Sequence, residues 1–394
     1  MKNFSNYKDY SLKEDLHFES KAVHGALGTE PLTGAVSMPI FQSVTFRHPE
    51  LGNSTGFDYS RLENPTRQEL ERTMAILEGG IKGFAFSSGQ AANMSVFSLL
   101  NPGDHIIMSD DIYGGTHRIV NDVFGKYGIN HTSVDLADLA AVKSAINENT
   151  KMIFIETPTN PVMKVADIEA LSKIAKEIGA LTVVDNTFLT PYFQKPLSLG
   201  ADIVTHSSTK YLGGHNDTIS GIVVVKDNEE IVNKIRVHMK SHGSQLAPMD
   251  SWLLLRGIKT LHLRMDRHNE NAYKVAHWLR TQPKVKQVYY VGFEDHRDYA
   301  VTKKQTTGFG GMISFAVDSF DTVKKILKGV DLVMFAESLG GTETLITYPT
   351  TQTHEDTPKH LKEELGITEC FLRLSVGIEN ADDIIADLDR AMNS

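Results

Sequence analysis

Short apolar runs alternate with helix-like segments between about residue 65 and residue 245 of this chain. This alternation is typical of repeated strand–helix–strand units, which build a sheet of parallel strands with helices on its faces. Helices are predicted over residues 66–77, 91–100, 168–178 and 229–238. In an open sheet of this kind, ligands bind outside the carboxyl ends of the strands. The sequence therefore predicts an α/β fold, with a site among the residues that follow the apolar runs.

A second unit is predicted beyond this region, because 394 residues exceed what one ordinary hydrophobic core holds. A long amphipathic stretch over 251–282 predicts the helix that opens a second domain. Shorter strands are predicted after it, over 288–291, 311–317 and 371–376. We interpret the chain as three parts: an N-terminal arm (1–60), a large domain (61–250) and a smaller α+β C-terminal domain (251–394).

Lys210 follows the apolar run 201–206, with Ser207 and Thr209 before it and two glycines shortly after it. An aldehyde cofactor needs an amine for a Schiff base, donors for its phosphate and room beside the backbone, and this segment offers all three. Taken alone, a lysine at the end of a strand is more often a solvated surface residue. The residues at the other strand ends decide between these two interpretations.

Three other predicted strands also end in residues with useful chemistry. Asp185 and Asn160 each follow an apolar run. The segment 87–90, Ser-Ser-Gly-Gln, lies between a predicted strand and the start of a predicted helix. At such a helix start, free N–H groups and the positive end of the helix dipole attract an anion, and Gly89 allows close approach. Four strand ends therefore carry the groups that a phosphorylated cofactor requires.

The number and order of these motifs make a family resemblance plain. The matching segments are 59–66, 87–92, 111–115, 156–161, 184–187, 207–214, 337–341 and 372–377. Over about residues 25–391, the chain resembles the cystathionine/methionine-metabolism family of pyridoxal-phosphate enzymes, the trans-sulfuration enzymes of fold type I (aspartate aminotransferase-like). This resemblance implies a large domain with a mostly parallel seven-stranded sheet, a smaller α+β C-terminal domain, and pyridoxal 5′-phosphate as the cofactor.

The resemblance also assigns the residues that bind the cofactor. Lys210 would form the Schiff base, and Asp185 would pair with the protonated pyridine nitrogen, which keeps the ring electron-withdrawing. Asn160 would face the 3′ oxygen of the ring. The phosphate would be bound by residues of this chain and by two residues of the neighbouring subunit: Ser88, Gly89, Gln90, Ser207 and Thr209 from the one, Tyr59 and Arg61 from the other.

On the substrate side, Tyr113 resembles the tyrosine that stacks on the cofactor ring and helps in proton transfer. Arg373 lies within an alternating strand, where an arginine without a partner is unexpected. It matches the bidentate clamp for the substrate α-carboxylate, and Ser338 matches a residue that lines the same pocket. The alternatives are ordinary structural roles, core packing for Tyr113 and a solvent-facing strand position for Arg373.

Glu337, Arg118 and Gly115 bear on the choice within the family. Methionine γ-lyases carry a cysteine where this chain has Gly115, and many β-lyases and methionine γ-lyases carry an apolar residue where it has Glu337. A glutamate and an arginine at the mouth of the pocket suit a substrate with a second amino-acid head, such as cystathionine. A surface salt bridge is the alternative interpretation.

We expect chemistry at the γ carbon, with γ-replacement of the cystathionine γ-synthase type, in which an acylated homoserine reacts with cysteine or sulfide. The first alternative is cystathionine γ-lyase, which yields 2-oxobutanoate, cysteine and ammonia. Methionine γ-lyase and cystathionine β-lyase rank below it. The resemblance further implies a homotetramer, built as a dimer of catalytic dimers, that acts on amino-acid substrates.

Composition agrees with a cytoplasmic enzyme and narrows its partners. The net charge of −9 disfavours nucleic acid and anionic membranes. Cys370 is the single cysteine, so an intrachain disulfide and a cysteine-based metal site are excluded, and no metal is expected. No stretch approaches the roughly 20 apolar residues of a membrane span. Neither of the common nucleotide-binding glycine motifs is present, which disfavours a nucleotide-binding protein.

Overall fold

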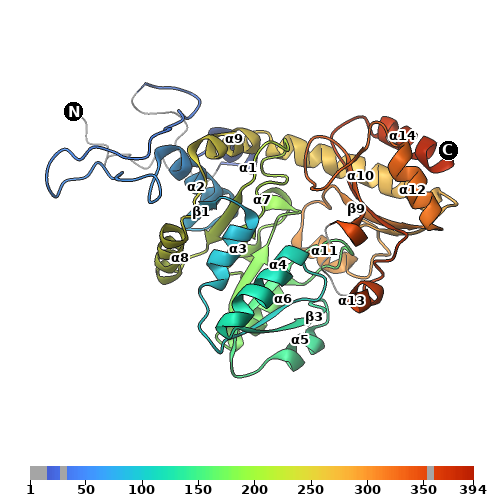
Figure 1. Ribbon diagram of the computed structural model, residues 1–394, viewed down its shortest axis with the longest axis horizontal. Helices are drawn as coiled ribbons and strands as arrows, with labels where there is room; N and C mark the ends of the chain where they lie inside the picture. The colour runs from blue at the N-terminus through green and yellow to red at the C-terminus, as the bar shows by residue number, and fades with distance from the viewer. Residues whose placement is uncertain (1–15, 27–32, 353–358) are drawn as a thin grey trace.

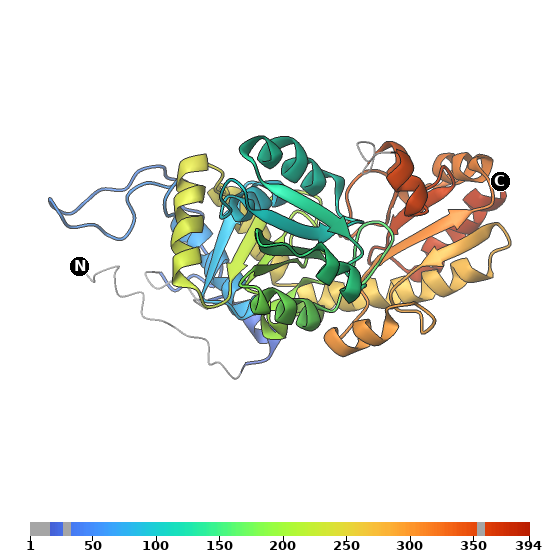
Figure 2. The same cartoon turned by 90° about the horizontal axis from the view of Figure 1, so that it is seen from below.

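The computed structural model describes residues 16–26, 33–352 and 359–394. Within these residues the chain forms two sheets, each covered by helices (Figures 1 and 2). The larger sheet has seven strands and the smaller has five. This arrangement confirms the predicted α/β class, with a mostly parallel large sheet and a smaller α+β unit. The predicted domain limits stay predictions.

The large sheet has the order β1-β7-β6-β5-β4-β2-β3. Its strands are β1 (Lys82–Phe86), β2 (His105–Ser109), β3 (Asn130–Val134), β4 (Thr150–Glu156), β5 (Leu181–Asp185), β6 (Ile203–His206) and β7 (Gly221–Val225). All adjacent pairs are parallel except the two that β7 makes with β1 and β6. The carboxyl ends of β4, β5 and β6 therefore meet at one edge, as the sequence predicts.

Side chains alternate along each central strand between two apolar cores, one on either face of this sheet. In β4, for example, Ile153 and Ile155 enter one core while Met152 and Phe154 enter the other. Helices α2 (Pro65–Glu78), α5 (Leu139–Ala145), α6 (Ile168–Glu177) and α9 (Pro248–Ile258) cover the first face. Helices α3 (Gly89–Phe97) and α8 (Glu229–His242) cover the second, together with the short π-helix η2 (Ile119–Val123). With both faces buried, polar chemistry is confined to the strand ends.

The predicted stretch over 251–282 is two helices, not one. Helix α9 ends at Ile258, and α10 (Leu261–Thr281) begins after Lys259 and Thr260. The break has a physical cause, because the carbonyl of Gly257 is used by other donors. Arg264 donates to it at 2.8 Å and Thr260 N–H at 3.2 Å, and Arg264 also donates to the carbonyl of Tyr211 at 2.6 Å. The junction thereby fixes the segment that follows Lys210.

The small sheet has the order β10-β11-β12-β9-β8. Its strands are β8 (Val285–Tyr289), β9 (Met312–Val317), β10 (Met334–Phe335), β11 (Leu345–Thr347) and β12 (Phe371–Ser375). Helices α10, α12 (Phe320–Gly329) and α14 (Ala381–Asn393) pack on it and close a third apolar core. The strand predicted over 288–291 is β8, which begins three residues and ends two residues earlier, because Tyr290 turns into the core beyond the strand end.

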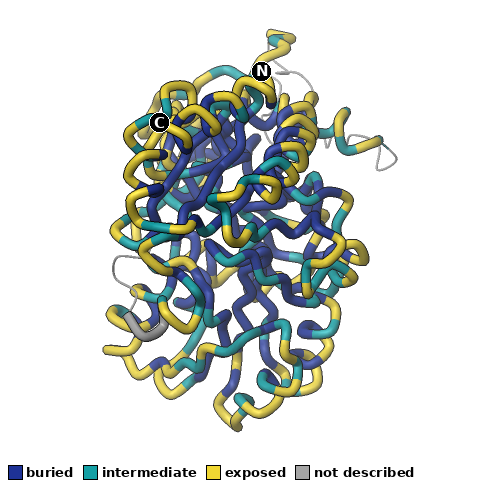
Figure 3. Tube along the Cα trace, turned by 90° about the vertical axis from the view of Figure 1, so that its right-hand side faces the viewer, coloured by how far each residue is buried: buried dark blue, intermediate teal, exposed yellow. Residues whose placement is uncertain are grey.

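The remaining helices are short: α1 (Phe18–His24), α4 (Gly114–Arg118), α7 (Thr190–Phe193), α11 (Tyr299–Gln305) and α13 (Lys359–Glu364). Buried residues concentrate along the sheets, as the tube in Figure 3 shows. Residues 33–60 contain no helix and extend away from the body of the protein (Figure 1). Within the described residues, no helix is long and apolar enough to cross a membrane.

Candidate active site

A cavity of about 290 Å³ opens where the carboxyl ends of β4, β5 and β6 face the small sheet. All but three of the predicted site residues line its wall. Those in the wall are Ser88, Gly89, Gln90, Tyr113, Asn160, Asp185, Ser207, Thr209, Lys210, Glu337, Ser338 and Arg373. Residues far apart in the sequence thus converge on one space. Tyr59, Arg61 and Arg118 do not line it.

Lys210 lies in the cavity wall just past β6. Its Nζ donates to Ser338 Oγ at 2.7 Å. Burial and, to a smaller degree, the charge of Arg373 lower the pKa of Lys210 to about 8, while Glu337 acts in the opposite direction. A lysine with such a pKa is partly neutral near physiological pH, which is the form that acts as a nucleophile or a base.

Ser338 connects this lysine to the arginine of the small sheet. Its carbonyl accepts a hydrogen bond from Arg373 Nη2 at 2.8 Å, while its hydroxyl accepts from Lys210. The backbone of Ser338 has φ +90°, a left-handed conformation that a side-chain-bearing residue rarely adopts. Such strain is typical of functional sites, where the surrounding contacts impose the geometry.

Arg373 is buried on β12, and its guanidinium faces the cavity. Nη1 donates to Asn160 Oδ1 at 2.9 Å and Nη2 to Thr347 Oγ1 at 3.2 Å, while Nε is buried without a hydrogen-bond partner. Among the described residues no carboxylate forms an ion pair with it, and burial lowers its pKa to about 10. A buried cation in a cavity wall, on which the exposed Glu337 acts without forming an ion pair, favours binding of a carboxylate.

The start of α3 forms a cradle suited to an anion. Ser88 caps the helix, its hydroxyl accepting from Ala91 N–H at 3.0 Å. A Cβ on Gly89 would lie 2.8 Å from Ser207 Cβ, so only glycine allows the two loops to meet. The first N–H groups of a helix have no intrahelical acceptor and can donate to phosphate oxygens.

Three carboxyl groups lie at or just past the ends of neighbouring strands, and two of them, Asp185 and Glu156, line the cavity. Asp185 ends β5 directly opposite Glu156, which ends β4. Burial raises the pKa of Asp185, and hydrogen bonds from Thr187 act against this rise. Burial and the charge of Asp185 raise the pKa of Glu156 well above its usual range. Burial raises the pKa of the third group, Asp111, to about 6.

Tyr113 caps α4 at the mouth of the cavity and is partly exposed. Its N–H donates to Glu156 Oε2 at 3.1 Å. A Cβ on Gly115 would lie 2.6 Å from Tyr113 Cε1 and 2.9 Å from Gln90 Nε2. The absence of a side chain at Gly115 therefore makes room for Tyr113 and Gln90 to lie side by side.

The three predicted residues outside the cavity are exposed. Arg61 Nη1 donates to the carbonyl of Lys240 at 3.0 Å, and its guanidinium carbon lies 5.5 Å from the centre of the Tyr59 ring. Arg118 lies in the last turn of α4, exposed to solvent. Within a single chain these side chains do not complete the site.

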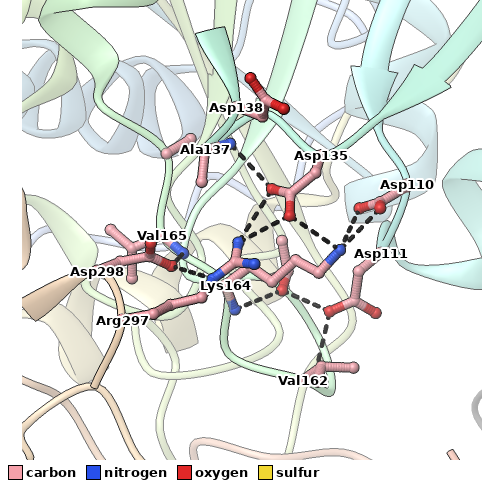
Figure 4. A network of polar contacts seen from close by, with 12 residues as sticks. Asp110, Asp111, Asp135, Ala137, Asp138, Val162, Lys164, Val165, Arg297 and Asp298 are labelled. Atoms are coloured by element: carbon pink, nitrogen blue, oxygen red, sulfur yellow. Dashed lines mark hydrogen bonds and ion pairs between the residues drawn. The ribbon is translucent and has the colours of Figure 1, made fainter. Parts of the chain in front are cut away.

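Sequence reasoning assigned no role to Glu156 or Asp111. A signal for Glu156 was available, because it ends its apolar run just as Asp185 ends the neighbouring one. Asp111 anchors the loop after β4, its Oδ2 accepting from Val162 N–H at 3.1 Å (Figure 4). In the same network Lys164 Nζ donates to Asp110 at 2.7 Å and Arg297 Nη2 to Asp135 at 2.8 Å, which joins this loop to the segment before α11.

The donor set fits the phosphorylated aldehyde cofactor that the sequence implies. It offers an amine with a lowered pKa, a carboxylate for a ring nitrogen, a phenol at the cavity mouth and a helix start for phosphate. Two further features agree with this fit. The close approach of Gly89 to Ser207 at the helix start leaves room for a phosphate, and the free Nε of Arg373 remains available for a carboxylate.

Comparison with known proteins gives the same picture. Residues 19–393 match the family described as Cys/Met metabolism PLP-dependent enzyme. The chain is 49% identical over 374 residues to a cystathionine beta-lyase of Lactococcus lactis subsp. cremoris (95% of this chain, 98% of the relative). It is 48% identical over 372 residues to a cystathionine gamma-lyase of Bacillus subtilis (94% and 98%). The crystal structure of cystathionine gamma-lyase from Lactobacillus plantarum, complexed with L-serine, superposes with a TM-score of 0.94 at 45% identity (96% and 99%).

Proposed function

We propose that this chain, which belongs to the Cys/Met metabolism PLP-dependent enzyme family, cleaves cystathionine at its γ-carbon–sulfur bond. The products would be cysteine, 2-oxobutanoate and ammonia. The observation that carries the proposal is the place of Glu337 in the cavity wall with Lys210 and Arg373. A carboxylate there suits a substrate that carries a second ammonium group far from its reacting carbon.

The protein uses pyridoxal 5′-phosphate, and several cavity residues are placed to hold it. We assign the phosphate to the start of α3, with Ser88, Gly89 and Gln90, and to Ser207 and Thr209. Asp185 would face the pyridine nitrogen from the end of β5, and Lys210 would carry the cofactor between turnovers. When bound, the cofactor supplies a ring that withdraws electrons from the α carbon of the substrate.

Arg373 and Lys210 would then orient and deprotonate the substrate. The guanidinium of Arg373 binds the α-carboxylate, which brings the α carbon toward the amine of Lys210. That amine, with its lowered pKa, takes the α proton, and removal of a β proton then lets the γ-carbon–sulfur bond break, its electron pair leaving with the sulfur, which gains a proton to become the thiol of cysteine. Ser338 holds the two residues at a fixed spacing, because it bonds to both. Positioning of this kind accounts for a large share of enzymatic rate enhancement.

Glu337 would bind the amino group at the far end of the substrate. In this assignment its carboxylate meets the ammonium of the leaving cysteine, which methionine lacks. Two of the reported relatives carry the name cystathionine γ-lyase, and their likeness to this chain is consistent with γ cleavage but does not favour it over β cleavage. The relative named as a β-lyase is equally similar, so the products must be measured.

We also propose that each site is built by two chains within a homotetramer. Tyr59 and Arg61 match phosphate-binding residues of the family, yet within one chain they lie outside the cavity. Tyr59 lies at the end of the segment 33–60, which extends away from the rest of the protein (Figure 1), and Arg61 follows this segment directly. A neighbouring chain could receive them.

A second candidate function is γ-replacement, in which cysteine displaces the acyl group of an acylated homoserine. The same observation favours it, because the amino group of an incoming cysteine could also pair with Glu337. The two reactions share their early steps and differ in whether a thiol or water completes the cycle.

Product analysis of the purified enzyme decides among these functions. With cystathionine, equal release of cysteine and 2-oxobutanoate supports the proposal. Release of homocysteine and pyruvate would establish β cleavage and overturn the γ assignment. Faster formation of cystathionine from acylated homoserine and cysteine would favour the second candidate, and no product in any assay would reject both.

A further inference from the structure

Glu156 connects two parts of the active site that the proposed mechanism treats separately. Its Oε2 accepts from the N–H of Tyr113 at 3.1 Å, and its Oε1 accepts from the N–H of Asn160 at 3.0 Å. Neither of these two residues lies inside a helix or a strand. The carbonyl of Tyr113 accepts from Thr116 and His117 at the start of α4, whereas the N–H groups of both Tyr113 and Asn160 donate to this one carboxyl group.

The connection continues around the cavity. The side chain of Asn160 accepts from Arg373, which donates to the carbonyl of Ser338, whose hydroxyl accepts from Lys210. One chain of hydrogen bonds thus joins the tyrosine at the mouth, through Glu156, to the arginine of the small sheet and the lysine. Glu156 is the link in this chain that lies in the large sheet, at the end of β4, where it also lines the cavity.

We propose that Glu156 is a positioning residue that sets where Tyr113 and Asn160 stand relative to the cofactor ring. It does not touch the reacting atoms. Its two oxygens tie the loop after β2 to the loop after β4, so that the phenol and the amide keep a fixed spacing. The inference depends on the cofactor but not on which carbon–sulfur bond is cleaved.

The neighbouring carboxyl groups offer a matched control. Both hydrogen bonds to Asp111, from Thr159 Oγ1 and Val162 N–H, are accepted by the same oxygen, Oδ2. An amide in its place keeps that oxygen and both bonds. The two bonds to Glu156 are divided between its two oxygens, so an amide must lose one of them. Glu156→Gln should therefore release one loop, whereas Asp111→Asn, also buried and on the same loop as Tyr113, should not.

The experiment compares wild type, Glu156→Gln and Asp111→Asn as cofactor-loaded enzymes. For Glu156→Gln we expect the circular dichroism of the bound cofactor to fall at least twofold at unchanged occupancy. With cystathionine, kcat/KM should fall at least tenfold, with a rise in KM as Arg373 loses its alignment. Asp111→Asn should keep the dichroism of wild type. Equal dichroism in all three proteins would overturn the proposal, and this readout needs no assumption about the substrate.

Hydrogen exchange of the wild-type holoenzyme provides a test if Glu156→Gln does not fold. Overlapping peptides around Tyr113 and Asn160 should show both amides exchanging at least a hundredfold more slowly than exposed loop amides. Fast exchange of either amide would refute the proposal that Glu156 holds both backbones in place. A variant that folds with wild-type thermal stability yet loses the cofactor dichroism would separate positioning from a general structural role.

Discussion

The substitution Glu337→Gln tests the choice of substrate most directly. Gln has the size of Glu but lacks its charge, so the cavity keeps its shape. Two unit charges about 4 Å apart attract by about 4 kcal/mol at an effective dielectric constant near 20. Glu337 is exposed at the cavity mouth, and solvent screening and desolvation reduce the net contribution to about 1–2 kcal/mol. We therefore expect kcat/KM for cystathionine to fall about 5-fold to 30-fold.

The assay uses a second substrate that lacks only the distal amino group, S-(2-carboxyethyl)-homocysteine. Wild type should prefer cystathionine over this analogue by about the same factor of 5 to 30, and Glu337→Gln should lose the preference. Glu337 also raises the pKa of Lys210, so its removal shifts the pH dependence of turnover toward lower pH. That effect is common to both substrates and cancels in their ratio. An unchanged ratio would refute the assigned role of Glu337.

Three further residues and one pH dependence test the other assignments. Lys210→Ala should abolish covalent attachment of the cofactor and turnover, which borohydride reduction and mass spectrometry detect; an active variant with a reducible adduct would reject the role. The pKa of Lys210 is lower in the folded protein than in the unfolded chain. In the cofactor-free protein, the free energy of unfolding of wild type should therefore rise by up to about 3 kcal/mol relative to Lys210→Met as the pH rises from about 8 to 10.5. Denaturant unfolding at fixed protein concentration measures this difference. Asp185→Asn keeps both Thr187 bonds on one oxygen, so it should fold normally and lose about a thousandfold or more in turnover at full cofactor occupancy. Arg61→Ala should weaken cofactor binding by about 1.5–3 kcal/mol, and hybrids with Lys210→Ala chains should regain activity if Arg61 acts across subunits; inactive hybrids containing both chains would contradict this.

The sequence predicts four strands of the large sheet, β1, β4, β5 and β6, because their signal is local. Each apolar run is short, fully buried and followed by a residue with distinctive chemistry, so the runs before Asp185 and Lys210 identify both the strands and the site edge. The break between α9 and α10 is different in kind. It depends on Arg264 reaching the carbonyls of Gly257 and Tyr211, contacts that no local pattern reveals.

The site shows the same division. Residues that touch the cofactor stand in recognisable motifs, whereas residues that hold them do not. Glu156 begins the segment 156–161, one of those that match the family, yet its role becomes visible only when the loops carrying Tyr113 and Asn160 come together. Three-dimensional proximity, not residue type, distinguishes it from an ordinary acid at a strand end.

The geometry of the site depends on how the two sheets are held against each other. Arg373 comes from the small sheet, and its partner Asn160 comes from the loop after β4 of the large one. Two other contacts join the same parts: Arg264 fixes the segment after Lys210 to α10, and Val165 N–H donates to Asp298 at 3.0 Å beside the ion pairs of Figure 4. A small rotation of one sheet against the other would move the guanidinium of Arg373 relative to Lys210. Substrate affinity in this protein should therefore respond to substitutions at the junction of the sheets, far from the cavity, as well as to those within it.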